Sequence, residues 1–237
     1  MIDIQARPQP FSADPHELAV IVIDMQNDFG APGGMFDRAG IDISAIRAAT
    51  DATVPVLAAA REAGIPVVYV TMEHAADLSN AGPRTGPHWR KHAPLGLGDE
   101  VLAPDGSTSR TLVRDTWSTR IVDALAPRPG DTVVAKHRFS GFFETDLDEV
   151  LRGLGATCLL VTGCTTSVCV ESTVRDAMFR DYSCIVLEDC SAEPIGAGFS
   201  RTNHEASLLV IETLFGWVSD AATVCDALAV SRTRTGR

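Results

Sequence analysis

Three side chains of complementary chemistry follow three short apolar runs of the sequence: Asp24, Lys136 and Cys169. Each run is rich in Val, Ile, Leu or Ala and has the length of a buried strand. Parallel strands end at one edge of their sheet, and α/β proteins bind ligands at that edge. We therefore expect the three side chains to meet. A thiol beside a carboxylate and an ammonium has the components for nucleophilic attack on a carbonyl carbon.

Cys169 is one of six cysteines, and a cysteine is commonly just a small buried residue. Its position separates it from the others, because it falls in the first turn of a helix expected over residues 168–180. The preceding Thr165, Thr166 and Ser167 are suitable N-cap residues. Free N–H groups and the helix dipole would lower the thiol pKa there and could hold an oxyanion.

The two partners each have a simpler alternative. The chain contains 18 arginines but only two lysines, Lys91 and Lys136, so a lysine at a strand end suggests a need for a compact ammonium. The alternative is chance placement. Asp24 could merely cap a turn. Against that, the residues after it, Met25 to Asn27, begin a loop of unusual polar density.

The elements that must position these residues alternate along the chain. We expect strands at 18–23, 66–70, 132–135, 158–162, 184–187 and 217–218, and helices at 44–63, 144–154, 168–180, 200–214 and 220–228. This alternation predicts an α/β fold, a single-domain three-layer αβα structure with a six-stranded parallel sheet. We assign residues 1–17 to an N-terminal extension, 18–229 to the domain, and 230–237 to a disordered tail.

Residues 72–130 form a long excursion rich in Pro, Gly and charged residues. The excursion begins just after a strand's carboxyl end, so we interpret it as a partial lid over the site. Six residues are candidates for substrate binding: Asn27, Phe29, Glu73, Trp89, Phe139 and Phe142. The aromatic ones have core or subunit-interface packing as an equal alternative, and Asn27 is favoured because it follows Asp24 closely.

Composition excludes several classes of protein. The formal net charge of −11 argues against binding nucleic acid or anionic lipid through charge. No stretch approaches the ~20 apolar residues of a membrane span, and the first ten residues lack the pattern of a signal peptide. We therefore expect a cytoplasmic protein. A nucleotide-binding Rossmann protein would share the fold class, but no glycine-rich phosphate-binding motif follows any strand.

The ordered motifs resemble the isochorismatase-like hydrolase superfamily, a group of cysteine amidohydrolases. The similarity extends from Leu18 to Leu228, and the matching segments read IVIDMQNDF, GIPVVYVT, DTVVAKHRFSGFFETDL, LLVTGCTTSVCVESTVRDA and YSCIVLEDC. Within the superfamily, SGFFETDL, VCVESTVRDAMF and ETLFGWVSDA look like the ureidoacrylate amidohydrolases of the ureide branch. Residues 73–98 look more like the biuret hydrolases, so the substrate stays open between these types.

The resemblance implies roles for individual residues. Asp24, Lys136 and Cys169 correspond to the family's catalytic triad, and the backbone N–H groups of Thr165 and Cys169 to its oxyanion hole. A cis peptide bond is implied between Cys164 and Thr165. The cycle requires no cofactor and no metal. Some relatives hold a metal through an Asp and paired histidines, but the spacing of the histidines here does not match; the three in question are His74, His88 and His92.

The expected function is hydrolysis of a C–N bond in a small linear ureide or carbamoyl compound of the ureidoacrylate, biuret or triuret type. The reaction would pass through a thioester and release ammonia or carbamate. Two alternatives remain: an amidase acting on another small amide, of the nicotinamide, maleamate or N-carbamoylsarcosine type, and a non-catalytic binding member of the superfamily. The expected partners are a small-molecule substrate and further copies of the chain in a dimer or tetramer.

Overall fold

The centre of the fold is a parallel sheet with the strand order β10-β9-β8-β3-β4-β7. The computed structural model describes residues 1–196, 198 and 200–235, with side chains to residue 229. The strands span β3 Leu18–Ile23, β4 Val67–Met72, β7 Thr132–Lys136, β8 Cys158–Cys164, β9 Ser183–Ala192 and β10 Trp217–Ser219. All six pair in parallel, which confirms the predicted six-stranded parallel sheet.

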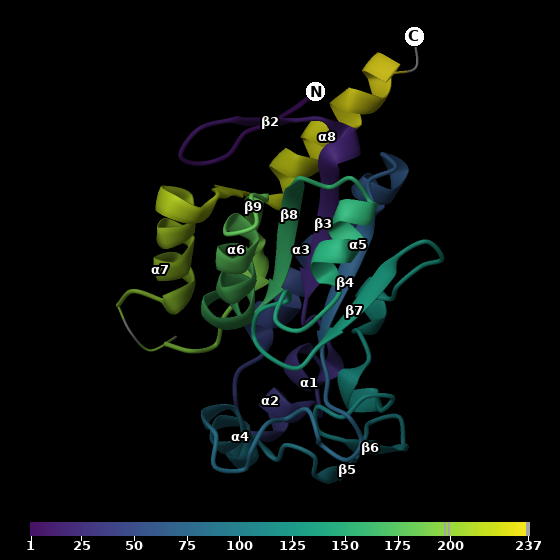
Figure 1. The fold of residues 1–237 in the computed structure, drawn as a ribbon, viewed down its shortest axis with the longest axis vertical. Helices are drawn as coiled ribbons and strands as arrows, with labels where there is room; N and C mark the ends of the chain where they lie inside the picture. Colours follow the sequence, from purple (N-terminus) through teal and green to yellow (C-terminus); the bar gives the residue numbers. More distant parts are fainter. Residues whose placement is uncertain (197, 199, 236–237) are drawn as a thin grey trace.

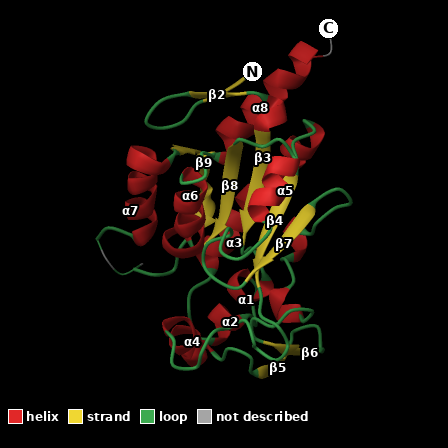
Figure 2. Cartoon of the chain, viewed as in Figure 1, coloured by secondary structure: helices red, strands yellow, loops and turns green. Residues whose placement is uncertain are grey.

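Helices cover both faces of the sheet and give three layers. On one face α3 and α8 pack together; on the other lie α5, α6 and α7 (Figures 1 and 2). Their bounds are α3 Ser44–Glu62, α5 Leu147–Gly153, α6 Glu171–Met178, α7 Asn203–Val210 and α8 Ala221–Thr235. This arrangement confirms the αβα fold class.

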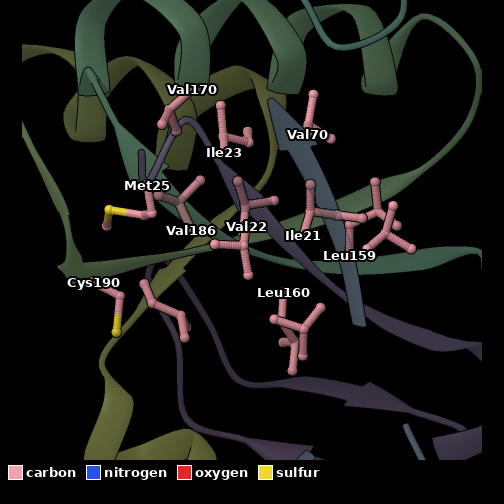
Figure 3. Close-up of a cluster of buried hydrophobic side chains, with 14 of the residues drawn as sticks. Ile21, Val22, Ile23, Met25, Val70, Leu159, Leu160, Val170, Val186 and Cys190 are labelled. Atoms are coloured by element: carbon pink, nitrogen blue, oxygen red, sulfur yellow. The ribbon is translucent and has the colours of Figure 1, made fainter. Parts of the chain in front are cut away.

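The core lies between the sheet and the helices, because the central strands have helices on both faces. Every residue of β3, β4 and β8 is buried. A strand buried on both faces has no polar side, so its sequence is a continuous apolar run rather than an alternating one. Figure 3 shows Ile21, Val22 and Ile23 of β3 packed among side chains from the neighbouring strands.

Several elements differ from the sequence-based expectation. The helix expected over 168–180 begins with a π-helical turn, η5 Thr166–Val170, and only then continues as α6. The helix expected over 200–214 ends in a second π-helical turn, η6 Ile211–Phe215. Hydrophobic periodicity does not distinguish such turns from a regular helix.

The N-terminal segment packs onto the domain. Strands β1 Ile2–Ile4 and β2 Phe11–Ala13 form an antiparallel hairpin, and Ile4 is fully buried in the common core. Backbone bonds of 2.8 and 3.0 Å join Arg7 to Val218 of β10. At the other end of the chain α8 continues to Thr235, so most of the stretch predicted as a tail is helical; residues 236 and 237 lie outside the described part.

Short elements gather beyond the carboxyl ends of the strands, at the bottom of Figure 1. The long excursion contributes α4 Pro87–His92, β5 Glu100–Leu102, β6 Thr108–Arg110 and the 3-10 turns η2 Ala93–Leu95, η3 Trp117–Thr119 and η4 Asp123–Leu125. The segment after β3 adds α1 Asn27–Gly30 and α2 Met35–Arg38. We call these elements of the long excursion, together with α1 and α2, the cover. A further 3-10 turn, η1 Pro15–Glu17, precedes β3 and does not belong to the cover. None of the helices in the described residues is long and apolar enough to cross a membrane.

Candidate active site

Asp24, Lys136 and Cys169 meet beneath the cover. Asp24 directly follows the central strand β3 and Lys136 is the last residue of β7, with β4 between them. Two strand spacings separate these backbones, about 10 Å. The long lysine side chain closes this gap, so that its Nζ lies 2.7 Å from Asp24 Oδ2 and 3.5 Å from Cys169 Sγ. The strand-end rule thus correctly predicted which side chains come together.

Burial controls the protonation of these groups, whose exposed fractions are 1% for Asp24, 1% for Lys136 and 6% for Cys169. Burial raises the pKa of Asp24, and the Lys136 charge offsets this only partly. Burial alone would lower the pKa of Lys136, but the Asp24 and Cys169 charges outweigh it and the pKa is raised. Burial and the Asp24 charge raise the pKa of Cys169.

The expected lowering of the Cys169 pKa is therefore wrong. The thiol sits in a buried π-helical turn beside a carboxylate, where burial and the negative charge of Asp24 both disfavour a thiolate. A group close enough to take its proton is thus needed for attack. The Asp24 carboxylate can do this, because its other oxygen, Oδ1, is buried without a hydrogen-bond partner in the described structure.

The turn before Cys169 provides backbone donors. The Cys164–Thr165 peptide bond is cis, as the resemblance implied. The Thr165 N–H has no acceptor among the described residues. The turn is held by the carboxylate of Glu193, the residue after β9, which accepts from the Ser167 N–H at 2.8 Å. The same carboxylate accepts from the N–H of Ile195 in its own loop at 2.9 Å. A carbonyl oxygen near Cys169 could therefore find an unused donor.

A cavity of about 350 Å³ opens onto the thiol. Its size falls in the lower range of small-molecule sites. The walls are largely apolar and come from the cover, the strand ends, the loop after β7, the β8–α6 turn and the loop after β9. The lining residues are Asp24, Phe29, Met35, Phe36, Ile41, Met72, Lys91, His92, Leu95, Phe139, Cys164, Thr165, Val168, Cys169, Pro194 and Ile195. Phe29 and Phe139, two of the predicted substrate-binding residues, are among them.

The other four predicted substrate-binding residues lie away from this cavity. The Asn27 side chain turns to the cover and donates to Trp117 O at 2.8 Å. Glu73 follows the lining residue Met72 in the sequence but does not itself line the cavity. Two aromatic rings are engaged elsewhere: Trp89 stacks under the Arg84 guanidinium, and Phe142 packs on Tyr182 with ring centroids 5.9 Å apart.

Several lining residues could not be identified from the sequence. Met35, Phe36 and Ile41 lie in the segment after β3, and Pro194 and Ile195 in the loop after β9, where no periodicity indicates which side chain turns inward. Lys91 did carry a signal. It is the second of two lysines in an arginine-rich chain, and both lysines lie around Cys169.

Three histidines form a packed cluster beside the cavity. The ring centroids of His74 and His88 lie 5.4 Å apart, and those of His88 and His92 lie 4.2 Å apart. Burial lowers the pKa of His74 to about 4 and that of His88 to about 3, so both rings are neutral near pH 7. Among the described residues, no group of three His, Cys, Asp or Glu side chains has the geometry to hold a metal ion.

A buried thiol, carboxylate and ammonium at the strand ends of an open parallel sheet is the arrangement of a cysteine hydrolase. Comparisons with known proteins agree. The isochorismatase domain profile matches residues 18–223. The ureidoacrylate amidohydrolase RutB of Methylobacterium radiotolerans is 42% identical over 227 residues, which is 96% of this chain and 85% of that protein.

Solved structures give the same assignment. A cysteine hydrolase from Pseudomonas syringae pv. phaseolicola is 30% identical, with a TM-score of 0.76 over 93% of this chain and 96% of that one. An isochorismatase family protein from Desulfovibrio vulgaris is 28% identical, with a TM-score of 0.72 over 90% and 98%. The chain belongs to the isochorismatase family, and it is a hydrolase.

Proposed function

We propose that this chain hydrolyses a small linear ureide, with ureidoacrylate as the preferred substrate. The observation that carries the proposal is the contact of Cys169 with the Asp24–Lys136 pair at the base of a cavity of about 350 Å³. A relative that is 42% identical and is named a ureidoacrylate amidohydrolase supports the choice of substrate. Biuret and triuret are the next candidates, because they present the same carbamoyl group.

The proposed reaction begins with transfer of the Cys169 proton to Asp24. The thiolate then attacks the ureide carbonyl carbon, and a C–S bond forms. Asp24 returns the proton to the leaving nitrogen as the C–N bond breaks, which leaves a thioester on Cys169. Asp24 next removes a proton from water, and the resulting hydroxide attacks the thioester carbonyl carbon. The C–S bond then breaks, the acyl group leaves as carbamate, and Asp24 returns the proton to the Cys169 sulfur. Lys136 stays protonated throughout and balances the charge that moves between Asp24 and the sulfur.

The tetrahedral intermediates carry a negative oxygen that needs donors. We assign these to the N–H groups of Thr165 and Cys169, of which the Thr165 group has no protein acceptor in the described structure. One such donor contributes roughly 3 kcal/mol to the transition state in other hydrolases. No cofactor has a step in this scheme, and the proposed partner is the small-molecule ureide itself. The cytoplasmic location and the homo-oligomer stay predictions.

Ammonia release from a panel of compounds tests the proposal. The panel is ureidoacrylate, biuret, triuret, N-carbamoylsarcosine, nicotinamide and maleamate. We expect the highest kcat/KM with ureidoacrylate, and an acyl-enzyme mass on Cys169 after rapid acid quench. Cys169→Ala should abolish turnover and keep the thermal melting temperature. Cys225→Ala is the matched control, because Cys225 lies on α8, away from the cavity, and its loss should leave turnover unchanged.

Three results would overturn the proposal. Full activity of purified Cys169→Ala protein would remove the proposed nucleophile. A higher kcat/KM for nicotinamide or maleamate than for any ureide would move the enzyme to the other small amides. No release from any compound would favour a non-catalytic binding member of the family.

A further inference from the structure

Lys91 is a cation at the cavity whose charge is not used by the protein. It lies in the last turn of α4, on the cover, and its side chain lines the cavity above Cys169. Among the described residues it has no ion pair and no hydrogen bond from its ammonium. Asp24, the only carboxylate among the described residues that line the cavity, is already paired with Lys136 at 2.7 Å.

The neighbouring His92 does not share this role. Its Nδ1 lies 2.8 Å from the carbonyl oxygen of His88, which can only accept, so Nδ1 carries the proton and Nε2 has a lone pair. Burial lowers the pKa of His92, which keeps the ring neutral. His92 can therefore accept an N–H of a ureide, whereas it cannot neutralise an anion. Lys91 is thus the one positively charged residue on the described cavity wall.

Because the other walls of the cavity are largely apolar, the charge of Lys91 favours anionic ligands over neutral ones. Most lining side chains are apolar, including Phe29, Phe36 and Leu95. An anion that enters such a cavity loses water and recovers the lost free energy only where it meets a cation. A neutral compound has no such requirement. A charge at the cover, with the thiol at the base, suits a ligand that carries its anion at the end opposite the reacting group.

We propose that Lys91 binds the carboxylate of the substrate and so makes the site selective for anionic ureides over neutral ones. This inference rests on the proposed function, because ureidoacrylate has a carbamoyl group at one end and a carboxylate at the other. Lys91 is then a specificity residue that acts in binding. The bond-breaking steps at Cys169 do not involve it. The two lysines of the chain thus have different roles around one cavity: Lys136 balances the charge of Asp24 and the sulfur, and Lys91 binds the substrate carboxylate.

The test compares ureidoacrylate with its methyl ester, which keeps the ureide and lacks the charge. In Lys91→Gln we expect KM for ureidoacrylate to rise about tenfold or more, as for loss of a hydrogen-bonded charge partner, with kcat within about threefold of wild type. Kinetics with the methyl ester should not change. Arg90→Gln is the matched control: Arg90 is the adjacent cation on α4 and is exposed, as Lys91 is, but it does not line the cavity. Its loss should leave the kinetics of both compounds unchanged.

A second readout does not depend on turnover. Iodoacetate and iodoacetamide both alkylate Cys169, and only the first is an anion. The ratio of their alkylation rates should fall several-fold in Lys91→Gln and stay constant in Arg90→Gln.

Equal effects of Lys91→Gln on the acid and its ester, or an unchanged alkylation ratio, would overturn the role of Lys91. If wild-type protein hydrolyses neither compound, the proposed function fails, and the alkylation ratio still decides whether Lys91 attracts anions to the thiol.

Discussion

At the scale of single residues, the protonation of Cys169 is the central feature. The thiol combines two opposing influences: burial and the Asp24 carboxylate disfavour the thiolate, while the Lys136 ammonium at 3.5 Å favours it. The first two prevail, and the pKa of the thiol is raised. Cys169 is therefore unreactive until a proton acceptor acts on it.

The pH dependence of the reaction follows from Asp24. As a base it must be ionised, and burial raises its pKa above that of an ordinary carboxyl group. We therefore expect kcat/KM to fall with decreasing pH through a pKa above that of an ordinary carboxyl group. Lys136, whose pKa is raised, stays charged over this range. Asp24→Asn should lower kcat about 10²- to 10⁴-fold and remove this acid limb.

The measurement is the pH dependence of kcat/KM, together with the pH dependence of the rate at which iodoacetamide alkylates Cys169. An acid limb at the usual carboxyl pKa would contradict the assignment of Asp24 as the base. So would an Asp24→Asn profile that keeps the wild-type shape, because some other group would then remove the thiol proton.

The sequence could predict the reacting residues but not the cavity around them. Asp24 and Lys136 end apolar runs, and strand ends converge for topological reasons, so their meeting follows from the pattern. Side chains in the cover follow no periodicity. Phe139 was predicted and lines the cavity, whereas Trp89 stacks with Arg84 at the side of it. The choice between such positions depends on loop conformation, which a single sequence does not specify.

At the scale of elements, strand β8 must bring the turn of Cys169 very close to β3. Gly163 lies one residue before the end of β8, with φ +135, and a Cβ there would come within 2.2 Å of the Ile23 carbonyl oxygen. Only glycine adopts this conformation and permits this approach. The absence of a side chain at Gly163 therefore allows the ends of β3 and β8 to pack closely. Asp24 and the turn of Cys169 follow these two strand ends.

Gly163→Ala should consequently destabilise the protein by about 3 kcal/mol, which corresponds to a fall in Tm of roughly 10 °C for a chain of this size. Activity should fall as well, because Asp24 is the next residue after Ile23. Gly153→Ala in α5 is the matched control, since its added Cβ meets nothing within 4 Å and alanine favours a helix. Equal Tm values for the two variants would show that the β3–β8 ends can separate without loss.

The π-helical turns mark the limit of element prediction. The sequence around Cys169 has the polar residues of an N-cap followed by apolar periodicity, which predicts an ordinary helix start. In the structure Val170 N–H instead bonds to Thr165 O, five residues back, and the turn is widened. Such a turn depends on contacts made across the fold, here by Glu193 from the end of β9, which lies far away in the sequence.

At the scale of the whole molecule, stabilising and reacting parts lie at opposite ends of the sheet. The cover and Cys169 lie beyond the carboxyl ends of the strands, whereas the β1–β2 hairpin lies at the amino ends, beside α8 (Figure 1). The hairpin contributes buried Ile2 and Ile4 to the common core, and backbone bonds tie it to β10. It therefore strengthens the fold without contact with the cavity.

Ile4→Ala tests whether the hairpin affects the stability of the fold without affecting the rate of the reaction. Removing a fully buried isoleucine side chain should cost about 2–5 kcal/mol of unfolding free energy and lower Tm by roughly 10 °C. At 25 °C the kcat of the folded protein should stay within about twofold of wild type, because the cavity is at the far end of the sheet. Gln5→Ala is the matched control: its side chain is exposed, and both Tm and kcat should be unchanged. A fall in kcat with an unchanged Tm in Ile4→Ala would contradict this division, since the hairpin would then act on the reaction itself and not on the stability of the fold.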